Sequence, residues 1–145
     1  MERFDSAARV MSGTHGKLWL SGERVAEVTA LQAKITKNKK ELARCGHMMS
    51  DHKVMGVSGK GSVTLFHVDS GMLLREEGIK SGLDNRYTLI SELNDPDAMG
   101  AERVALYGVS FDEMTLADWK AAAEGSITVP FTFNDYELLD AVQPQ

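Results

Sequence analysis

The sequence predicts a mainly β, antiparallel domain: a sandwich or small barrel of six or seven strands with one flanking helix. Its 145 residues are enough for one hydrophobic core and leave little room for a second. Several runs alternate apolar and polar residues with a period of two, as half-buried strands do. Thirteen glycines against three prolines are typical of a chain with many tight turns. We therefore treat residues 1–145 as a single domain.

The N-terminal region contains the clearest hairpin signal. Residues 1–12 have no clean period, and we expect them to form a loose N-terminal arm. Two β-like runs follow, at 16–20 and 25–36, on either side of Ser21 and Gly22, a short turn that suits a hairpin. The second run alternates its faces, one of which carries Thr29, Leu31, Ala33 and Ile35. This predicts a long strand with one solvent-facing side.

The segment 38–61 is the least regular part of the chain. It combines positive charges, three methionines and several turn points with no sustained period, and we expect a long loop between strands. A structureless loop of more than about 12–15 residues in a compact domain is usually functional or disordered. Methionines are adaptable at protein surfaces, although each one alone could equally fill a core. We therefore expect this loop to contact another protein.

The rest of the chain predicts four more strands and one helix. The strands are expected at 62–68, 86–93, 102–114 and 127–138. Between the first two, Asp69 or Ser70 can cap a short helix that Gly82 ends. Residues 115–125 are ambiguous, and three consecutive alanines favour a second short helix over a loop. Pro130 cannot donate to a β ladder, which predicts an edge or bulged position there.

The charge balance excludes some classes of protein. Sixteen Lys and Arg against 21 Asp and Glu give a net charge of −5, which argues against a protein that grips nucleic acid through its overall field. The span 37–60 is nevertheless positive, so the remainder is more negative than the whole chain. No apolar run reaches the roughly 18 residues of a membrane-spanning helix, and we expect no membrane anchor. The first residues lack the apolar segment of a secretory signal, so we expect synthesis in a cytoplasm.

No motif in the sequence predicts catalysis. The GVSGKGS run fails the spacing of a phosphate-binding loop, because Ser62 rather than lysine follows Gly61, and we interpret it as a flexible hairpin turn. No nucleophile-elbow pattern occurs. The acidic pairs at 76–77 and 95–97 are of the kind that normally solvates a helix or loop. We therefore predict no enzyme activity, no catalytic residue and no cofactor.

Four potential metal ligands lie close together in the segment 38–61: Cys45, His47, Asp51 and His52. Zinc sites usually present ligand pairs at repeated spacings, and this group has no second cluster. We expect a polar loop whose histidines meet a partner surface, and no metal site. Cys45 is the only cysteine, so it forms no internal disulfide.

Five stretches carry a family resemblance: SGTHGKLWLSGERVAEV, KITKNKKEL, MMSDHKVMGVSGKGSVT, ERVALYGVSFDEM and VPFTFNDYEL. Together they closely resemble XkdM-like phage tail tube proteins over most of the chain, from about Ser12 to Leu139. Each motif alone is weak, whereas their common order is specific.

The resemblance implies a structural subunit of the inner tube of a contractile, phage-like tail or a tail-derived bacteriocin. In that family two β-sheets and a helix form the subunit, and six subunits close a ring whose hairpins form a continuous inner β-barrel. Stacked rings make a tube that passes DNA without specific binding, or punctures an envelope. The implied partners are further copies of the chain, the sheath, the baseplate or tube initiator and the tape-measure protein. The implied location is a virion tail or phage-like particle, assembled in the bacterial host cytoplasm.

By position, the resemblance implies that the runs 16–20 and 25–36 form the first hairpin and that the loop 38–61 reaches a neighbouring subunit or ring. The inter-subunit contacts that we predict are Asn38, Lys39, Lys40, Arg44, His47, Met48, Met49, His52, Lys53 and Met55. A channel through which DNA slides should not bind phosphate. We therefore expect an acidic or neutral bore, with the basic loop directed at subunit contacts.

A small ligand-binding β-barrel, a carrier of an apolar molecule, is the alternative from a different class. It needs a closed barrel around a large apolar pocket. This chain has ten aromatic residues and spends about 24 residues on a polar loop, so a structural assembly protein fits better.

Overall fold

The computed structural model describes residues 7–76, 78–97 and 100–142. Within these residues, eight antiparallel strands are joined in the order β2-β1-β5-β6-β7-β4-β3, with β8 paired to β6. The strands are β1 Gly16–Leu20, β2 Glu23–Arg24, β3 Val28–Leu42, β4 Asp51–Phe66, β5 Tyr87–Leu93, β6 Glu102–Phe111, β7 Ser126–Phe133 and β8 Asp135–Asp140. The mainly β, antiparallel fold class is confirmed.

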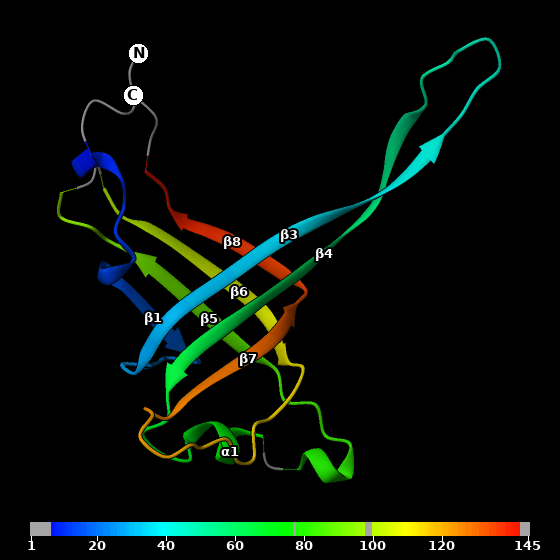
Figure 1. The fold of residues 1–145 in the computed structure, drawn as a ribbon. Helices are drawn as coiled ribbons and strands as arrows, with labels where there is room; N and C mark the ends of the chain where they lie inside the picture. The colour runs from blue at the N-terminus through cyan, green and yellow to red at the C-terminus, as the bar shows by residue number, and fades with distance from the viewer. Residues whose placement is uncertain (1–6, 77, 98–99, 143–145) are drawn as a thin grey trace.

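The strands form two layers that pack face to face, with β3, β4 and β7 crossing in front of β1, β5, β6 and β8 (Figure 1). Strand β6 belongs to both layers, because it pairs with β5 and β8 along most of its length and with β7 at Ser110 and Phe111. Gly108 lies at this corner with a φ of 63°, and a Cβ there would lie 2.4 Å from the Asn134 side chain. Glycine therefore allows β6 to change layers.

The hydrophobic core lies between the two layers. Its buried members are Leu18, Leu20, Val25, Val63, Leu65, Leu89, Leu106, Val109, Phe111, Ile127, Val129, Phe131 and Phe133. Phe131 is fully buried and meets Phe111 edge to face, with ring centroids 6.3 Å apart. The odd-numbered residues of β4 and β7 supply the core side, so the predicted alternation of both strands is confirmed.

The GVSGKGS run is neither a phosphate loop nor the flexible turn that we expected, because it lies inside β4. Gly59 pairs with Phe133 and Gly61 with Phe131 across the strand. A Cβ at Gly59 would lie 2.4 Å from the Phe133 ring, and one at Gly61 would lie 2.6 Å from the Phe131 ring. The glycines therefore make room for the two phenylalanines on the core face.

The predicted loop 38–61 is wrong as secondary structure. Strands β3 and β4 form one long hairpin, paired from Val28–Leu65 to Leu42–Asp51, and only residues 43–50 connect them. Both faces of this part of the hairpin are exposed, so neither strand needs the apolar alternation that marks a half-buried strand. A bulge at Met55, which lies unpaired between Val54 and Gly56, further disturbs the period of two.

The predicted turn at Ser21 and Gly22 is present, but its second strand is short. Both residues have positive φ, 49° and 90°, as in the two-residue hairpin turn that follows the strand twist. The following strand β2 has only two residues, and β3 pairs with β4 instead of β1. Thr29 is a bulge relative to β4, so Val28 and Leu31 both pack against the core.

The helices differ from the prediction. Helix α1 spans Gly71–Arg75, and three 3-10 turns span Ala7–Arg9, Gly13–His15 and Ile79–Ser81. The second helix expected at 115–125 is absent, because its alanines have no buried face to pack and a short isolated helix is unstable. None of the helices among the described residues is long and apolar enough to cross a membrane.

The N-terminal arm is tied to the body at its end. The Ser12 N–H donates to Asp95 Oδ2 at 2.8 Å, and the Asp97 N–H donates to Asp95 Oδ1 at 2.9 Å. These two backbone donors, followed by the nearby His15, hold the pKa of Asp95 below its ordinary value. The rest of the predicted arm begins at Ala7 with a 3-10 turn, and residues 1–6 lie outside the described residues.

Pro130 lies on β7 beside the end of β6, where its nitrogen does not need to donate a hydrogen bond. Its carbonyl accepts from the Asp112 N–H at 2.9 Å, and in an antiparallel strand the carbonyl and nitrogen of one residue point to the same side. The nitrogen without a hydrogen therefore points toward β6, which ends at Phe111. The expected strand 127–138 is divided at Asn134 into β7 and β8.

Candidate assembly surface

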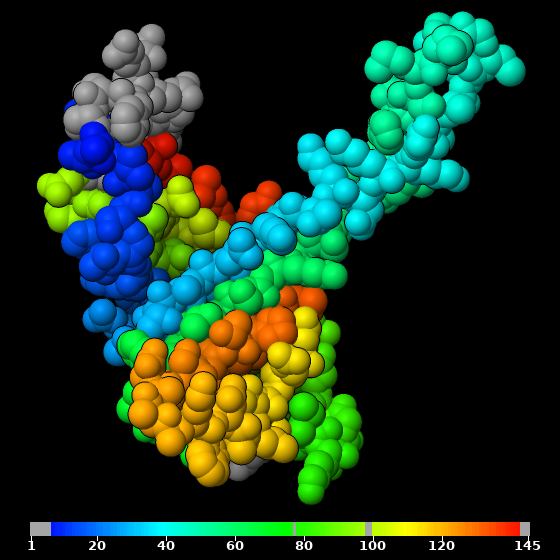
Figure 2. Space-filling view, in the orientation of Figure 1, coloured from blue at the N-terminus to red at the C-terminus, as the bar shows by residue number. Residues whose placement is uncertain are grey.

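The dominant surface feature is the part of the β3–β4 hairpin that extends beyond the body, here called the hairpin arm (residues 35–58). The pairing of β4 with β7 stops at Gly59–Phe133, so beyond that point β3 and β4 pair only with each other. Figure 2 shows this segment projecting clear of the body. Strand β3 is also the last strand of the layer, and no strand of the described residues pairs with its outer edge. A long free edge of this kind is a template for pairing with another chain.

One face of the hairpin arm continues the core side of the sheet and carries exposed apolar residues, with Lys37 across from Val57 and Lys39 across from Val54. Ile35, Val54 and Val57 lie on it and are 40%, 45% and 63% exposed. Where this face meets the body there is a surface cleft of about 430 Å³, whose lining includes Phe133 and Tyr136. Apolar side chains in an uncovered row indicate a contact surface for another molecule.

The tip of the hairpin arm exposes methionines among basic residues. Met48, Met49 and Met55 are 102%, 87% and 65% exposed. The Arg44 Nη2 and His47 Nδ1 atoms lie 3.3 Å apart within the tip. Long flexible thioethers adapt to irregular partner surfaces, which suits a contact that is made on assembly.

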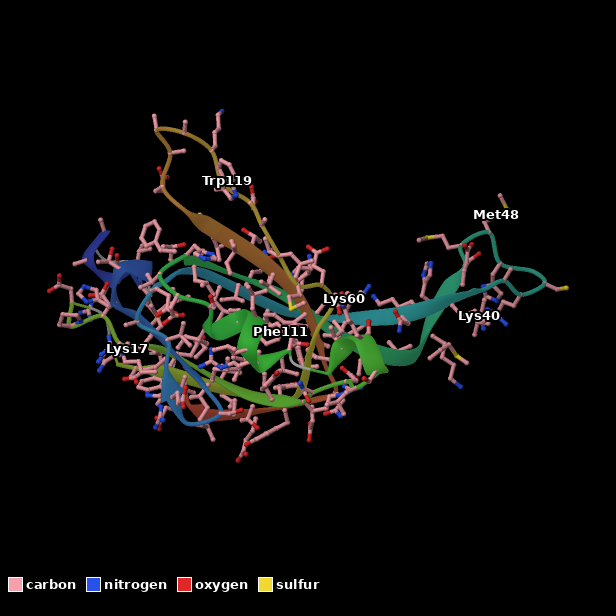
Figure 3. The ribbon with its side chains drawn as sticks, turned by 90° about the horizontal axis from the view of Figure 1, so that it is seen from below. Lys17, Lys40, Met48, Lys60, Phe111 and Trp119 are labelled. Carbon is pink, nitrogen blue, oxygen red and sulfur yellow. The ribbon has the colours of Figure 1, made fainter. Side chains whose placement is uncertain are left out.

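The opposite face of the hairpin is polar, and its lysines face one another. The pairing register places Lys34 directly across from Lys60, and Lys40 directly across from Lys53. Strand β3 keeps its alternation through the bulge at Met55, so Lys34 and Lys40 share a face. Neither lysine pair makes a salt bridge with a described residue. Figure 3 shows Lys60 at the base of the hairpin arm and Lys40 near its tip.

A second uncovered region lies where the two layers fail to close. A cleft of about 380 Å³ runs between β1 and the start of β3, and its lining includes Leu18, Leu31 and Leu93. Strand β3 ends its layer here, and β2 covers β1 only at Trp19 and Leu20, so the start of β1 has no strand beside it among the described residues. The sandwich is therefore open on the side where a further strand could enter.

Trp119, the most exposed aromatic residue among the described residues, was not among the predicted contact residues. Trp119 is 87% exposed and Leu116 is 73% exposed in the loop 112–125, which Figure 3 shows standing away from the sheets. A tryptophan in a polar segment without periodicity was the available signal, because solvent-exposed tryptophans are enriched at interfaces.

The ten residues that we predicted as inter-subunit contacts are all exposed in the isolated chain. Three of them lie on β3 (Asn38, Lys39 and Lys40), three lie on β4 (His52, Lys53 and Met55), and the other four lie in the tip between the strands (Arg44, His47, Met48 and Met49). Their contact role stays a prediction. Across the described parts of the chain, no three His, Cys, Asp or Glu side chains are grouped to hold a metal ion.

The geometry defines a class of protein: a small β domain with a free strand edge, a long hairpin exposed on both faces and an open side between its two layers. Solved structures with this fold include the sheath–tube complex of an extracellular contractile injection system, at a TM-score of 0.72 with 8% identity, covering 91% of this chain and 93% of that one. The sheath/tube terminator structure of that system aligns with a TM-score of 0.74 and 8% identity, over 93% and 100% of the two chains.

The family follows from the sequence comparisons. The family model described as phage tail tube protein matches residues 4–140. The PBSX phage-like element protein XkdM of Bacillus subtilis (strain 168) is 37% identical over 135 residues, covering 91% of this chain and 92% of that protein. The chain belongs to the phage tail tube protein family, and it is a structural tail tube subunit rather than an enzyme.

Proposed function

We propose that six copies of the chain close into a ring and that rings stack into the inner tube of a contractile, phage-like tail. The observation that carries this proposal is the hairpin arm, whose edges and apolar face have no partner within the described residues. Closure of the β3–β4–β7 layers of neighbouring copies into one barrel would pair the free β3 edge and remove it from solvent. The open cleft beside β1 and β3 lies at the edge where such closure would take place.

The finer parts of the function rest on the family and on the fold. The tube would conduct DNA without sequence-specific binding, or puncture an envelope when a sheath contracts. Its partners would be the sheath, the baseplate or tube initiator and the tape-measure protein, and assembly would occur in the cytoplasm of a bacterial host. The sheath–tube and baseplate complexes among the structural neighbours support these partners.

The proposal is tested by shortening the hairpin arm. Replacing Lys40–Met55 with a single glycine leaves Lys39 and that glycine as a two-residue turn between the paired residues Asn38 and Gly56. The body should keep its circular dichroism spectrum and unfolding transition, because the deleted residues bury nothing in the core. Electron microscopy and sedimentation should show that tubes no longer form. Long intact tubes from the shortened chain would contradict the proposal.

The single cysteine offers an independent measurement on the unaltered chain. Cys45 is exposed in the tip, so a thiol reagent should reach it freely in the soluble subunit. In tubes grown from an initiator complex, the same reaction should slow when the tip contacts another copy. A reaction rate that is equal before and after assembly would remove the tip from the proposed contact. A chain that never polymerises, with or without an initiator, would contradict the tube itself.

The ligand-binding carrier is not supported. The cavity enclosed by the core, which is lined by residues including Leu20, Leu65 and Phe111, has a volume of about 10 Å³. A pocket for a small apolar molecule is on the order of 300–1,000 Å³. The larger hollows in the described structure lie at strand edges, where a protein chain fits better than an enclosed ligand.

A further inference from the structure

One face of the β3–β4–β7 layer packs on the other layer, and the opposite face is not packed. In the proposed tube, the position of this unpacked face determines what lines the bore. The core face of this layer packs on the other layer through Val63, Leu65 and Phe131. If copies of this layer close into a barrel around a bore, the face that is not packed must line the bore. The inference below therefore rests on the proposed function.

This free face carries hydroxyls, amides and lysines. The register places on it Gln32, Lys34, Thr36 and Asn38 from β3, Ser58, Lys60, Ser62 and Thr64 from β4, and Thr128, Pro130 and Thr132 from β7. None of these residues is acidic. Three carboxylates border it. Asp84 accepts from the Ser110 hydroxyl at 2.6 Å and pairs with Arg86 at 2.9 Å, Asp112 lies beside Pro130, and Asp51 lies across from Leu42 near the tip, where the opposed Lys40 and Lys53 share its face. The net charge of the face is therefore positive, although the whole chain carries −5.

The lysines on this face have no compensating partner in the subunit. Like charges directly opposite on neighbouring strands are destabilising, and here Lys34 faces Lys60 with no ion pair to a described residue. The second opposed pair, Lys40 and Lys53, extends the positive charge along the hairpin arm. Closing several copies around one axis would bring these charges together in a narrow space, which strengthens their attraction for anions.

The chemistry of the face fits a phosphate backbone better than a base. Lysine and hydroxyl groups contact phosphate oxygens without reading sequence. Phe66, at the end of β4, is the one aromatic residue that the register places on this face in the described strands, so base stacking along the face has little support. A row of lysine contacts that carry no sequence preference permits sliding along DNA.

We propose that the Lys34–Lys60 face is a track for the phosphodiester backbone of DNA, with Lys40 and Lys53 extending it toward the next ring. This replaces the expected acidic bore: part of the positive charge of the span 37–60 faces the channel, where the four lysines of this face outnumber Asp51 and Asp112. The binding is sequence-independent and salt-dependent, because it consists of charge contacts to phosphate.

The test compares two double variants with equal changes in net charge. Lys34→Gln with Lys60→Gln removes the opposed pair, and Lys80→Gln with Lys120→Gln removes two exposed lysines from the 3-10 turn Ile79–Ser81 and from the loop 112–125. Binding of a short fluorescent DNA duplex is measured by anisotropy over a range of salt concentrations, on assembled tubes and on the soluble chain. The first variant should bind at least about tenfold more weakly at low salt, and its salt slope should fall by about 1 for each lysine removed. The control should bind like the unaltered chain.

The outcomes separate the track from the tube. If tubes form and both double variants bind DNA equally, the track is overturned and the tube stands. If the Lys34 and Lys60 variant alone fails to assemble, these lysines serve subunit contacts and the track is again overturned. If the unaltered chain forms no tubes, the proposed function fails. In that case DNA binding of the two double variants is compared on the soluble chain, whose lysine face is uncovered. Equal binding would overturn the track, and weaker binding of the Lys34 and Lys60 variant would support it.

Discussion

The β3–β4 hairpin has one half in the body and one half in the hairpin arm, and the two halves differ in what stabilises them. Strands β3 and β4 run through both the body and the hairpin arm with one nearly continuous register. In the body half, β4 pairs also with β7 and buries Val63 and Leu65, whereas in the hairpin arm every described residue of both strands is exposed or nearly so. The backbone ladder is the same, so the difference lies in side-chain burial.

A backbone hydrogen-bond ladder alone therefore gives a β ribbon little stability. A backbone hydrogen bond contributes about 1 kcal/mol net, and an isolated two-stranded ribbon is marginal in water. The body adds the burial of apolar side chains, each of which contributes about 1.5–3 kcal/mol. The hairpin arm keeps its apolar residues exposed, so its burial energy is available only to a contact with another chain.

The largest difference between the two halves should come from a core truncation. Phe131→Ala removes a fully buried ring that contacts Phe111 and Phe133, and we expect a loss of about 3–5 kcal/mol in the free energy of unfolding. The matched truncation in the hairpin arm, Val57→Ala, should cost less than about 0.5 kcal/mol. Urea unfolding followed by fluorescence measures both. Equal losses would mean that the hairpin arm is packed against the body in solution.

A pair of glycines on β4 gives the next sharpest comparison. A Cβ at Gly61 would lie 2.2 Å from the Gln32 carbonyl oxygen and 2.6 Å from the Phe131 ring, whereas a Cβ at Gly56 would meet nothing within 4 Å. We expect Gly61→Ala to cost about 1–3 kcal/mol by overpacking. Gly56→Ala, in the hairpin arm, should be neutral or slightly stabilising, because it restricts the unfolded chain. Thermal unfolding of both variants checks this, and a neutral Gly61→Ala would contradict the close packing of the aromatic rings on β4.

The body was largely predictable because its signal is burial. The alternation of Val129, Phe131 and Phe133 follows directly from a strand with one core face, and the turn at Ser21 and Gly22 follows from its required positive φ. The prediction of a helix at 115–125 was wrong, because the helix propensity of alanine has little effect without a surface to pack against. The layer change at Gly108 could not be foreseen, because it depends on contacts with Asn134, distant in the sequence.

The form of the hairpin arm was not predictable from the sequence, and its contact role stays a prediction. Its composition indicated a contact segment, and the resemblance supplied the family. Its strands show no alternation of apolar and polar residues, because neither face is buried within the single subunit. Opposed lysines such as Lys34 and Lys60 lie 26 positions apart in the sequence, so only the register could place them on one face.

A pH-dependent prediction concerns the body, where burial acts on a titratable group. Burial, followed by the Glu76 carboxylate, raises the pKa of Tyr87 to about 12 from an ordinary value of 10.0. The folded chain therefore holds the proton more tightly than the unfolded chain. The stabilisation is fully present below about pH 10 and is lost as the pH rises toward 12. Part of this tyrosine remains exposed to solvent, so we expect less than about 1 kcal/mol between about pH 9 and 11.

Two tyrosine variants isolate this effect. Tyr87→Phe should lose some stability at neutral pH, because its hydroxyl donates to the Arg75 carbonyl, but it should decline less steeply in alkali. Tyr136→Phe, at an exposed position of β8, should keep the alkaline slope of the unaltered chain. Unfolding by urea at a series of pH values gives both slopes. An unchanged slope in Tyr87→Phe would show that other groups cause the alkaline loss.

The smallest expected change in the free energy of unfolding comes from a double variant in the hairpin arm, and this variant tests whether the hairpin arm acts in assembly. Val54→Thr with Val57→Thr keeps the shape of both side chains but replaces two exposed apolar residues of the hairpin arm with polar ones. Unfolding of the soluble subunit should change by less than about 0.5 kcal/mol. In assembly the same pair should cost several kcal/mol, because buried hydroxyls would replace apolar contacts, and every 1.4 kcal/mol raises the critical concentration about tenfold. Sedimentation of tubes measures that concentration. The control, Val10→Thr with Val68→Thr, changes two exposed valines outside the hairpin arm and should assemble normally. If the first pair unfolds the subunit or leaves assembly intact, the division of the molecule into a self-sufficient body and a hairpin arm completed by neighbours fails.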